Sequence, residues 1–214
     1  MNNLDYLNKY KLFIVDYDGT VLDSMRMWNT MLSEFLKSEN IKFDVDIDKL
    51  AKEQTNKESV EYIHENYFSN ITKSELENKM YDFVRIRYIK QILKTNADVM
   101  LSEMKKHGKV VLFSATAKEL LEDSFKTNNI NRFFDKVYSA GDLNTTKSGG
   151  LGYEVVLNIE GFKKEDTLVV EDVNHAIKGA RSLNFDTLAI YDGQKSWNEI
   201  KEISTYNLNL LDLI

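Results

Sequence analysis

Acidic residues directly follow short apolar runs at two distant points of this 214-residue sequence. Asp16 and Asp18 lie at the end of the apolar run in FIVDYDGT, and Glu171 and Asp172 end the stretch TLVVED. Such runs predict buried strands, and a carboxylate is costly to bury without a partner. These acids therefore either sit in exposed turns or meet a cation or a reacting group.

The spacing of Asp16 and Asp18 suits chemistry on a phosphate ester. Residues i and i+2 of an extended segment face the same way, so the two carboxylates can address one substrate. One can attack phosphorus while the other donates a proton to the leaving oxygen. Because crowded carboxylates repel one another, they also require a cation, and all-oxygen ligands suit Mg²⁺.

Three further residues could contact the phosphate itself. Gly19 permits a tight turn and lets backbone N–H groups approach a phosphate. Ser114 follows the apolar run at residues 110–113, and its hydroxyl can hydrogen-bond a phosphoryl oxygen. Lys147 lies in the glycine-bearing loop TTKSGG, where its ammonium group can offset charge in a transition state.

Strands and helices alternate along most of the chain. The predicted strands are 11–15, 110–113, 137–139, 167–170 and 187–191, and the predicted helices are 97–107, 117–128, 153–159, 175–183 and 195–203. This alternation predicts an α/β fold, a parallel sheet with helices on both faces. Ligands of such sheets bind beyond the carboxyl ends of the strands, so the candidate residues should gather at one edge.

Residues 21–95 follow a different pattern. Their apolar residues recur at helical spacing, and no convincing strand occurs among them. We therefore expect an inserted all-helical second domain at residues 21–95, with the sheet domain formed by residues 1–20 and 96–214.

Composition limits the possible partners. A net charge of −6 without a basic cluster argues against nucleic acid. No apolar run approaches membrane-spanning length, and the N-terminal residues lack a signal-peptide apolar region. There is no cysteine, and the three histidines are scattered, which argues against disulfides and a histidine-rich metal site. We expect a cytoplasmic protein without a membrane partner, and a monomer by default.

The ordered motifs resemble those of the haloacid dehalogenase superfamily. DYDGT followed by VLDS, a serine after the second strand, a lysine, and ED after an apolar strand cover nearly the whole chain. The interval from Lys147 to Glu171 is similar to that of the branch containing β-phosphoglucomutase and phosphoglycolate phosphatase. The resemblance implies a Rossmann-like core with a helical cap inserted after the first motif.

The resemblance also implies roles. Asp16 would be the nucleophile that forms an aspartyl-phosphate, and Asp18 would act as general acid and then as general base. Superfamily dehalogenases lack an acid at the position of Asp18, so its presence favours phosphoryl transfer to or from an oxygen. The implied activity is a Mg²⁺-dependent phosphatase acting on a small phosphorylated metabolite.

The implied ligand set uses the same motifs. Ser114 and Lys147 would bind phosphate. Mg²⁺ would be held by Asp16, the backbone carbonyl of Asp18 and Asp172, with Glu171 close by. Relatives commonly carry proline three residues after the motif lysine, where this chain has Gly150. The adjacent glycines, Gly149 and Gly150, predict a more flexible loop and therefore a less firmly held Lys147.

Each motif also has a plain structural explanation. Asp-Gly is a common turn, Glu171–Asp172 could cap a helix, Ser114 could be a cap, and TTKSGG could be a solvated loop. Two other functions stay open as well. A mutase of the β-phosphoglucomutase type uses the same core, although residues 21–40 lack the histidine that such mutases carry. A non-catalytic protein that binds a phosphorylated metabolite is the third possibility.

Overall fold

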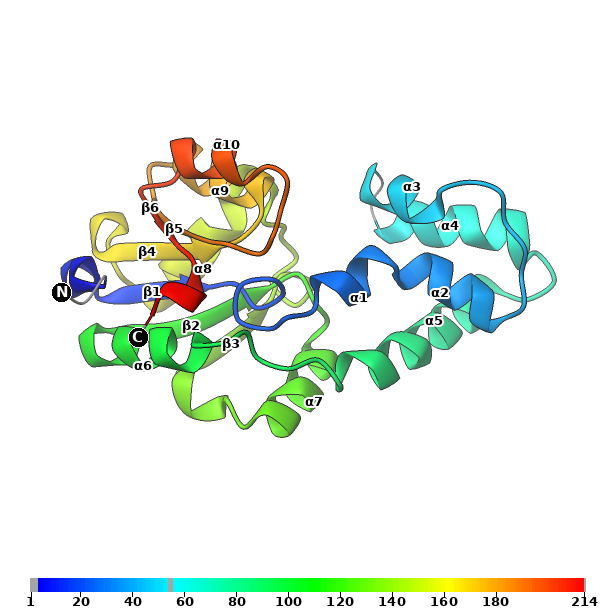
Figure 1. Cartoon of the computed structure of the whole chain (residues 1–214), viewed down its shortest axis with the longest axis horizontal. Helices are drawn as coiled ribbons and strands as arrows, with labels where there is room; N and C mark the ends of the chain where they lie inside the picture. Colours follow the sequence, from blue (N-terminus) through cyan, green and yellow to red (C-terminus); the bar gives the residue numbers. More distant parts are fainter. Residues whose placement is uncertain (1–3, 54–55, 214) are drawn as a thin grey trace. The chain divides into compact units, whose positions relative to one another are not determined.

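In a computed structural model that describes residues 4–53 and 56–213, a six-stranded parallel sheet forms the centre of one unit (Figure 1). The strands are β1 (Leu12–Val15), β2 (Lys109–Ser114), β3 (Lys136–Ser139), β4 (Thr167–Glu171), β5 (Asp186–Ile190) and β6 (Tyr206–Leu208). Their spatial order is β3-β2-β1-β4-β5-β6. The predicted α/β fold with a parallel sheet is confirmed.

Strand β1 lies in the middle of the sheet, where its apolar side chains are covered on both faces. All four of its residues are buried, as expected for a parallel strand packed on both faces. Val15 lies opposite Leu112 of β2 and Val170 of β4. This register brings the residues that follow β1 to the level of Ser114 on one side and Glu171 on the other.

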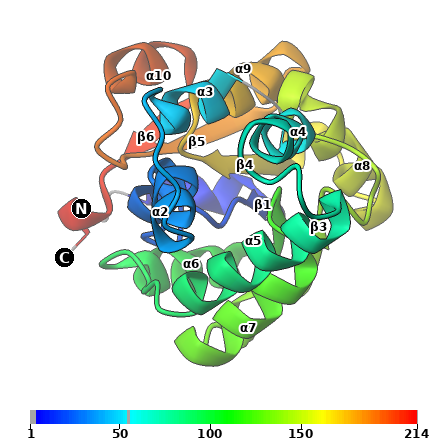
Figure 2. The ribbon, with the colours of Figure 1, turned by 90° about the vertical axis from the view of Figure 1, so that its right-hand side faces the viewer.

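Helices cover both faces of the sheet, as Figure 2 shows. The helices of this unit are α6 (Ala97–His107), α7 (Lys118–Asn128), α8 (Leu151–Glu160), α9 (Asn174–Ser182) and α10 (Trp197–Ile203). Helices α8 and α9 pack with Leu12 and Ile14 of β1 in one apolar cluster, whereas α6 and α7 lie on the opposite face. Because side chains alternate along a strand, Asp16 faces the same side as Ile14, towards α8.

The second unit, Ser24–Lys90, is helical. It contains α1 (Met25–Asn29), α2 (Met31–Ser38), α3 (Ile47–Glu53), α4 (Asn56–Tyr67) and α5 (Lys73–Tyr88). It has its own core, in which residues such as Leu36, Ile63 and Leu76 are fully buried. Helix α5 begins with a capping box, since the Thr72 hydroxyl accepts from the Glu75 N–H and the Glu75 carboxylate accepts from the Thr72 N–H.

The segments that connect the two units pair with each other and belong to the sheet unit, which comprises Met1–Asp23 and Gln91–Ile214. Leu22 and Leu93 form an antiparallel bridge, and the Asp23 N–H donates to the Ile92 carbonyl at 2.9 Å. The boundaries of the helical unit, Ser24 and Lys90, therefore lie a few residues inside the range 21–95 that we expected from helical spacing. Within the described residues, no helix is both long enough and apolar enough to cross a membrane.

Strand β6 was not anticipated from the sequence. It has only three residues, of which Leu208 alone is buried, so it carries no clear alternating pattern. It pairs in parallel with β5, with Leu208 opposite Ile190. Tertiary pairing at the sheet edge, rather than local sequence, makes these residues a strand.

The loop that carries Lys147 is packed closely against α9, so the expectation of a flexible loop is wrong. Gly149 and Gly150 have φ angles of +71° and +82°, which favour glycine. A Cβ atom on Gly150 would lie 2.3 Å from the Gly179 carbonyl oxygen, and one on Gly179 would lie 2.7 Å from the Gly150 nitrogen. Backbone meets backbone here, so the glycines fix the loop instead of loosening it.

We predict that Gly179→Ala destabilises the protein. The new methyl group would force the Gly150 backbone away from α9, and such overpacking costs about 1–3 kcal/mol of the free energy of unfolding. Urea unfolding measures the change. Gly141→Ala is the matched control, because a Cβ there meets only the Ser139 hydroxyl oxygen, at 3.6 Å. Equal stability of the two variants would contradict the close packing of this loop.

Candidate active site

The candidate site lies between β1 and β4, where successive connections of the chain change from one side of β1 to the other. From β1 the chain passes to β2 and β3 on one side of the sheet, whereas β4, β5 and β6 lie on the other side. A crevice is expected beyond the carboxyl ends of the two strands at such a point. Here those strands are β1, which leads into Asp16, and β4, which ends in Glu171.

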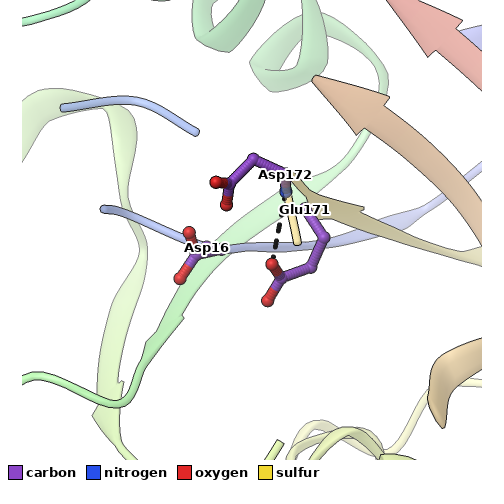
Figure 3. A group of neighbouring side chains, drawn as sticks. All are labelled: Asp16, Glu171 and Asp172. Atoms are coloured by element: carbon purple, nitrogen blue, oxygen red, sulfur yellow. Dashed lines mark hydrogen bonds between the residues drawn. The ribbon is translucent and has the colours of Figure 1, made fainter. Parts of the chain in front are cut away.

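Three carboxylates meet at this edge, as Figure 3 shows. Asp16, Glu171 and Asp172 are all buried, and one carboxylate oxygen from each lies within 4.8 Å of the others. The Asp16 N–H donates to the Val170 carbonyl at 2.9 Å, which extends the β1–β4 pairing by one step. The parallel register thus brings together acids that are distant in sequence.

Lys147 lies among these acids. Its side chain is only 9% exposed, and its ammonium group contacts Asp16 Oδ1 and donates to Glu171 Oε1 at 2.8 Å. Tyr153 of α8 donates its hydroxyl hydrogen to the same Glu171 oxygen at 2.7 Å. The sequence analysis missed Tyr153, although it occurs six residues after Lys147 on the buried side of a predicted helix.

Asp18 occupies a different environment from Asp16. Its carboxylate is not part of the three-acid group, and Oδ2 accepts a hydrogen bond of 2.8 Å from the Thr116 hydroxyl. The Thr116 N–H in turn donates to Ser114 Oγ at 3.0 Å. Thr116 was also missed, and its only sequence signal is its position two residues after Ser114 in FSAT.

Gly19 shapes the turn that follows Asp18. It has a φ angle of +83°, and its N–H donates to the Leu22 carbonyl at 2.9 Å. This N–H is therefore used inside the turn. That Gly19 lets neighbouring backbone N–H groups approach a phosphate stays a prediction. The next residue, Thr20, donates its hydroxyl hydrogen to Asp172 Oδ1 at 3.2 Å.

The plain structural explanations do not account for the other motifs. Helix α9 begins at Asn174 with Val173 as its N-cap, so Asp172 does not cap it. Helix α7 begins at Lys118 with Ala117 as its N-cap, so Ser114 does not cap that helix. Lys147 is buried and ion-paired, which a solvated loop lysine would not be.

Two of these carboxyl groups, those of Asp16 and Asp172, have a raised pKa. Burial, followed by the negative charge of Glu171, raises the pKa of Asp16 to about 7, although Lys147 opposes this shift. Burial and the charges of Asp16 and Glu171 also raise the pKa of Asp172 well above its usual value. Burial alone would lower the pKa of the Lys147 ammonium, but Asp16 and Glu171 raise it above its usual value.

The residues present fit a divalent cation. One ammonium group faces three buried carboxylates, which leaves negative charge uncompensated. The neighbouring negative charges that help raise the pKa of Asp16 and of Asp172 would also attract a cation. An all-carboxylate oxygen set suits Mg²⁺ rather than a soft transition metal.

A family model for haloacid dehalogenase-like hydrolases matches residues 13–190. The chain belongs to this family. The matched region begins in β1 and ends with β5, and it therefore includes every candidate site residue described above. The resemblance expected from the ordered motifs is confirmed.

Curated relatives include bacterial pyrophosphatases. Pyrophosphatase PpaX from Bacillus cereus (strain Q1) is 24% identical over 187 residues, which cover 85% of this chain and 83% of the relative. Pyrophosphatase PpaX from Bacillus mycoides (strain KBAB4) is 29% identical over 91 residues. That second match spans 42% of this chain and 42% of the relative's length.

Solved structures share the fold at low sequence identity. YfnB from Bacillus subtilis, solved bound to magnesium, superposes with a TM-score of 0.71 and 18% identity, covering 94% of each chain. A variant of CbbY from Rhodobacter sphaeroides, solved with xylulose-(1,5)-bisphosphate, superposes with a TM-score of 0.75 and 12% identity. That match covers 95% of this chain and 96% of CbbY.

We predict that Asp172→Asn stabilises the protein at pH 7.5 when Mg²⁺ is absent. Because the pKa of Asp172 is raised in the folded state, ionisation of this carboxyl destabilises the fold as the pH rises above about 4. The amide avoids that cost, so the melting midpoint should increase by roughly 2–8 °C, which corresponds to about 1–2 kcal/mol.

Melting curves from pH 4 to pH 8 test this prediction. The difference between the variant and the unaltered protein should shrink towards pH 4, where the Asp172 carboxyl is protonated in the folded state. The Thr20 hydroxyl can still donate to the asparagine oxygen, so the hydrogen bond is kept. A variant that melts lower than the unaltered protein at pH 7.5 would contradict the repulsion among these acids.

Proposed function

We propose that this protein is a Mg²⁺-dependent phosphatase that hydrolyses a small phosphorylated metabolite through an aspartyl-phosphate intermediate. The observation that carries the proposal is the different placement of two acids only two residues apart. Asp16 lies in the buried acid group beside Lys147, whereas Asp18 lies outside this group on the Thr116 hydroxyl. One position suits a nucleophile beside a cation, and the other suits a proton carrier.

The first step is attack on phosphorus. A carboxylate oxygen of Asp16 forms a bond to the phosphorus atom, while the bond from phosphorus to the ester oxygen breaks. Asp18 gives its proton to the leaving oxygen, so the product departs as an alcohol. Thr116 orients the Asp18 carboxyl for this transfer through its hydrogen bond to Oδ2.

The second step returns the protein to its starting state. Asp18, now ionised, takes a proton from a water molecule, whose oxygen attacks the phosphorus of the aspartyl-phosphate. The bond between phosphorus and the Asp16 oxygen breaks, which releases inorganic phosphate and restores the Asp16 carboxylate. Asp18 is protonated again and ready for the next substrate.

Positive and polar groups would stabilise the phosphoryl oxygens in both steps. The Lys147 ammonium group forms ion pairs with Asp16 and Glu171. Ser114 is the last residue of β2, and its hydroxyl lies at the same edge of the sheet. Asp16, the Asp18 backbone carbonyl and Asp172 would hold Mg²⁺, with Glu171 beside them. When bound there, the metal would supply charge neutralisation for the phosphoryl group.

The names of related proteins support a phosphate substrate. PpaX is named a pyrophosphatase, and CbbY was solved with a sugar bisphosphate. Pyrophosphate and the sugar bisphosphate both contain the phosphorus–oxygen bonds that the proposed chemistry breaks. We therefore propose a phosphorylated small molecule as the substrate of this chain.

The direct test measures phosphate release from a panel of phosphomonoesters and pyrophosphate, with and without Mg²⁺. We expect metal-dependent release, and we expect Asp16→Asn to lower it by about 10³-fold or more because the amide is not a nucleophile. Circular dichroism checks that the variant is folded. Unchanged turnover in a folded Asp16→Asn protein would refute the nucleophile assignment.

The role of Asp18 predicts the effect of a substitution at Thr116. Thr116→Val removes the hydroxyl that orients the Asp18 carboxyl, and we expect kcat to fall by about tenfold, the cost of a hydrogen bond to a charged group. Thr127→Val is the control, since that exposed hydroxyl of α7 donates to the Asp123 carbonyl of the same helix. Equal kcat values for the two variants would argue against Thr116 orienting Asp18.

A mutase is the main competing outcome, because the same aspartyl-phosphate could pass to a sugar hydroxyl instead of water. Incubation with β-glucose 1-phosphate separates the two activities. Inorganic phosphate as the main product supports the phosphatase, whereas glucose 6-phosphate would replace it with a mutase. Tight binding of phosphate esters without any Mg²⁺-dependent turnover would instead show a binding protein.

A further inference from the structure

Lys94 lies in the connecting segment that leads into α6, outside all of the motifs described above. Its ammonium group donates to the Gly19 carbonyl at 2.7 Å, to the Tyr191 carbonyl at 2.8 Å and to Asp192 Oδ1 at 2.6 Å. The side chains of Lys94 and Asp192 are each only 13% exposed. All three ammonium hydrogens of this lysine therefore have acceptors within the protein.

One of these contacts is to the turn that carries Asp18. The turn is closed by hydrogen bonds from the Gly19 N–H to the Leu22 carbonyl and from the Leu22 N–H to the Tyr17 carbonyl. The Lys94 backbone N–H adds a bond of 2.9 Å to the Val21 carbonyl. Lys94 thus contacts the turn twice, and its side chain binds the carbonyl of the residue directly after Asp18.

The other contacts are to the loop that follows β5. In this loop the Asp192 N–H donates to Gln194 Oε1 at 2.6 Å, and Gln194 Nε2 donates to the Asp172 backbone carbonyl at 2.8 Å. The loop that Lys94 binds is therefore itself bonded to the backbone of a candidate metal ligand. Through Lys94, the Asp18 turn and the segment that contains Asp172 share a single network.

We propose that Lys94 is a positioning residue that fixes the Asp18 turn relative to Asp172, an inference that rests on the proposed phosphatase function. The acid that carries the proton and the acids that bind the metal come from different loops. A displacement of about 1 Å between them would be costly, because proton transfer requires hydrogen-bond geometry at the leaving oxygen. Because Lys94 donates to acceptors on both loops, it keeps the Asp18 turn and the loop bonded to Asp172 at a fixed separation.

The test compares Lys94→Met with the unaltered protein and repeats the comparison in an Asp192→Asn background. The second pair matters because Lys94→Met alone leaves the buried Asp192 carboxylate without its cation, which could unfold the protein. In the Asp192→Asn background no such charge remains, and the two proteins differ in the neutral-acceptor bonds of Lys94, to the Gly19 and Tyr191 carbonyls and to the asparagine oxygen. Lys178→Met is the control, since this lysine forms a surface ion pair with Glu199.

We expect Lys94→Met to lower kcat by about 10- to 100-fold in both backgrounds, with KM changed by less than about threefold. Lys94→Arg should recover part of kcat, because a guanidinium also donates to carbonyl oxygens. An equal kcat with and without Lys94 in the Asp192→Asn background would overturn the proposal. So would a change confined to KM.

Amide hydrogen exchange tests the proposal independently of activity. The amides of Gly19 and Leu22 should exchange faster when Lys94 is replaced in the Asp192→Asn background, whereas those of β2 should not change. Unchanged exchange in the turn would overturn the proposal even if the protein is an active phosphatase. If the unaltered protein releases no phosphate from any substrate, the proposed function fails, and the exchange result still decides whether Lys94 holds the turn.

Discussion

The ammonium group of Lys147 lies between two carboxylates that come from neighbouring strands, Asp16 after β1 and Glu171 at the end of β4. Such a buried contact is stable only if all of its charges arrive together, because an unpaired buried charge is costly. Its formation therefore depends on the β1–β4 register, which brings the acids to one level, and on the loop before α8, which brings the lysine. The close backbone contact between Gly150 and Gly179 fixes that loop.

Buried carboxylates repel one another at this edge of the sheet. The faces of β1 and β4 are covered by helices, so the residues that follow these strands are also shielded from water. This burial, together with the neighbouring charges, raises the pKa of Asp16 and of Asp172. At the position of Asp172, an amide side chain would be more stable in the absence of a cation. Functional sites commonly combine a stable scaffold with a locally destabilised group of residues in this way.

Two acids with almost the same sequence position have different partners. Asp16 faces α8 and meets a lysine, whereas the carboxylate of Asp18 meets a threonine hydroxyl. Alternation alone would place both on one side of an extended strand, but the strand ends at Val15 and the chain turns at Gly19. The two carboxylates therefore have different hydrogen-bond partners, as the proposed nucleophile and proton carrier would require.

The sequence by itself determined the parallel α/β architecture, the inserted helical segment, the family and the principal acids. These follow from local signals, namely apolar runs, helical spacing and short motifs such as DYDGT. The tertiary structure alone decided which polar residues support those acids. Tyr153, Thr116 and Lys94 each lie outside the motif acids, and their partners are set by register and packing between distant segments. It also decided that Gly149 and Gly150 form a fixed loop, since the close approach of α9 cannot be inferred from two adjacent glycines.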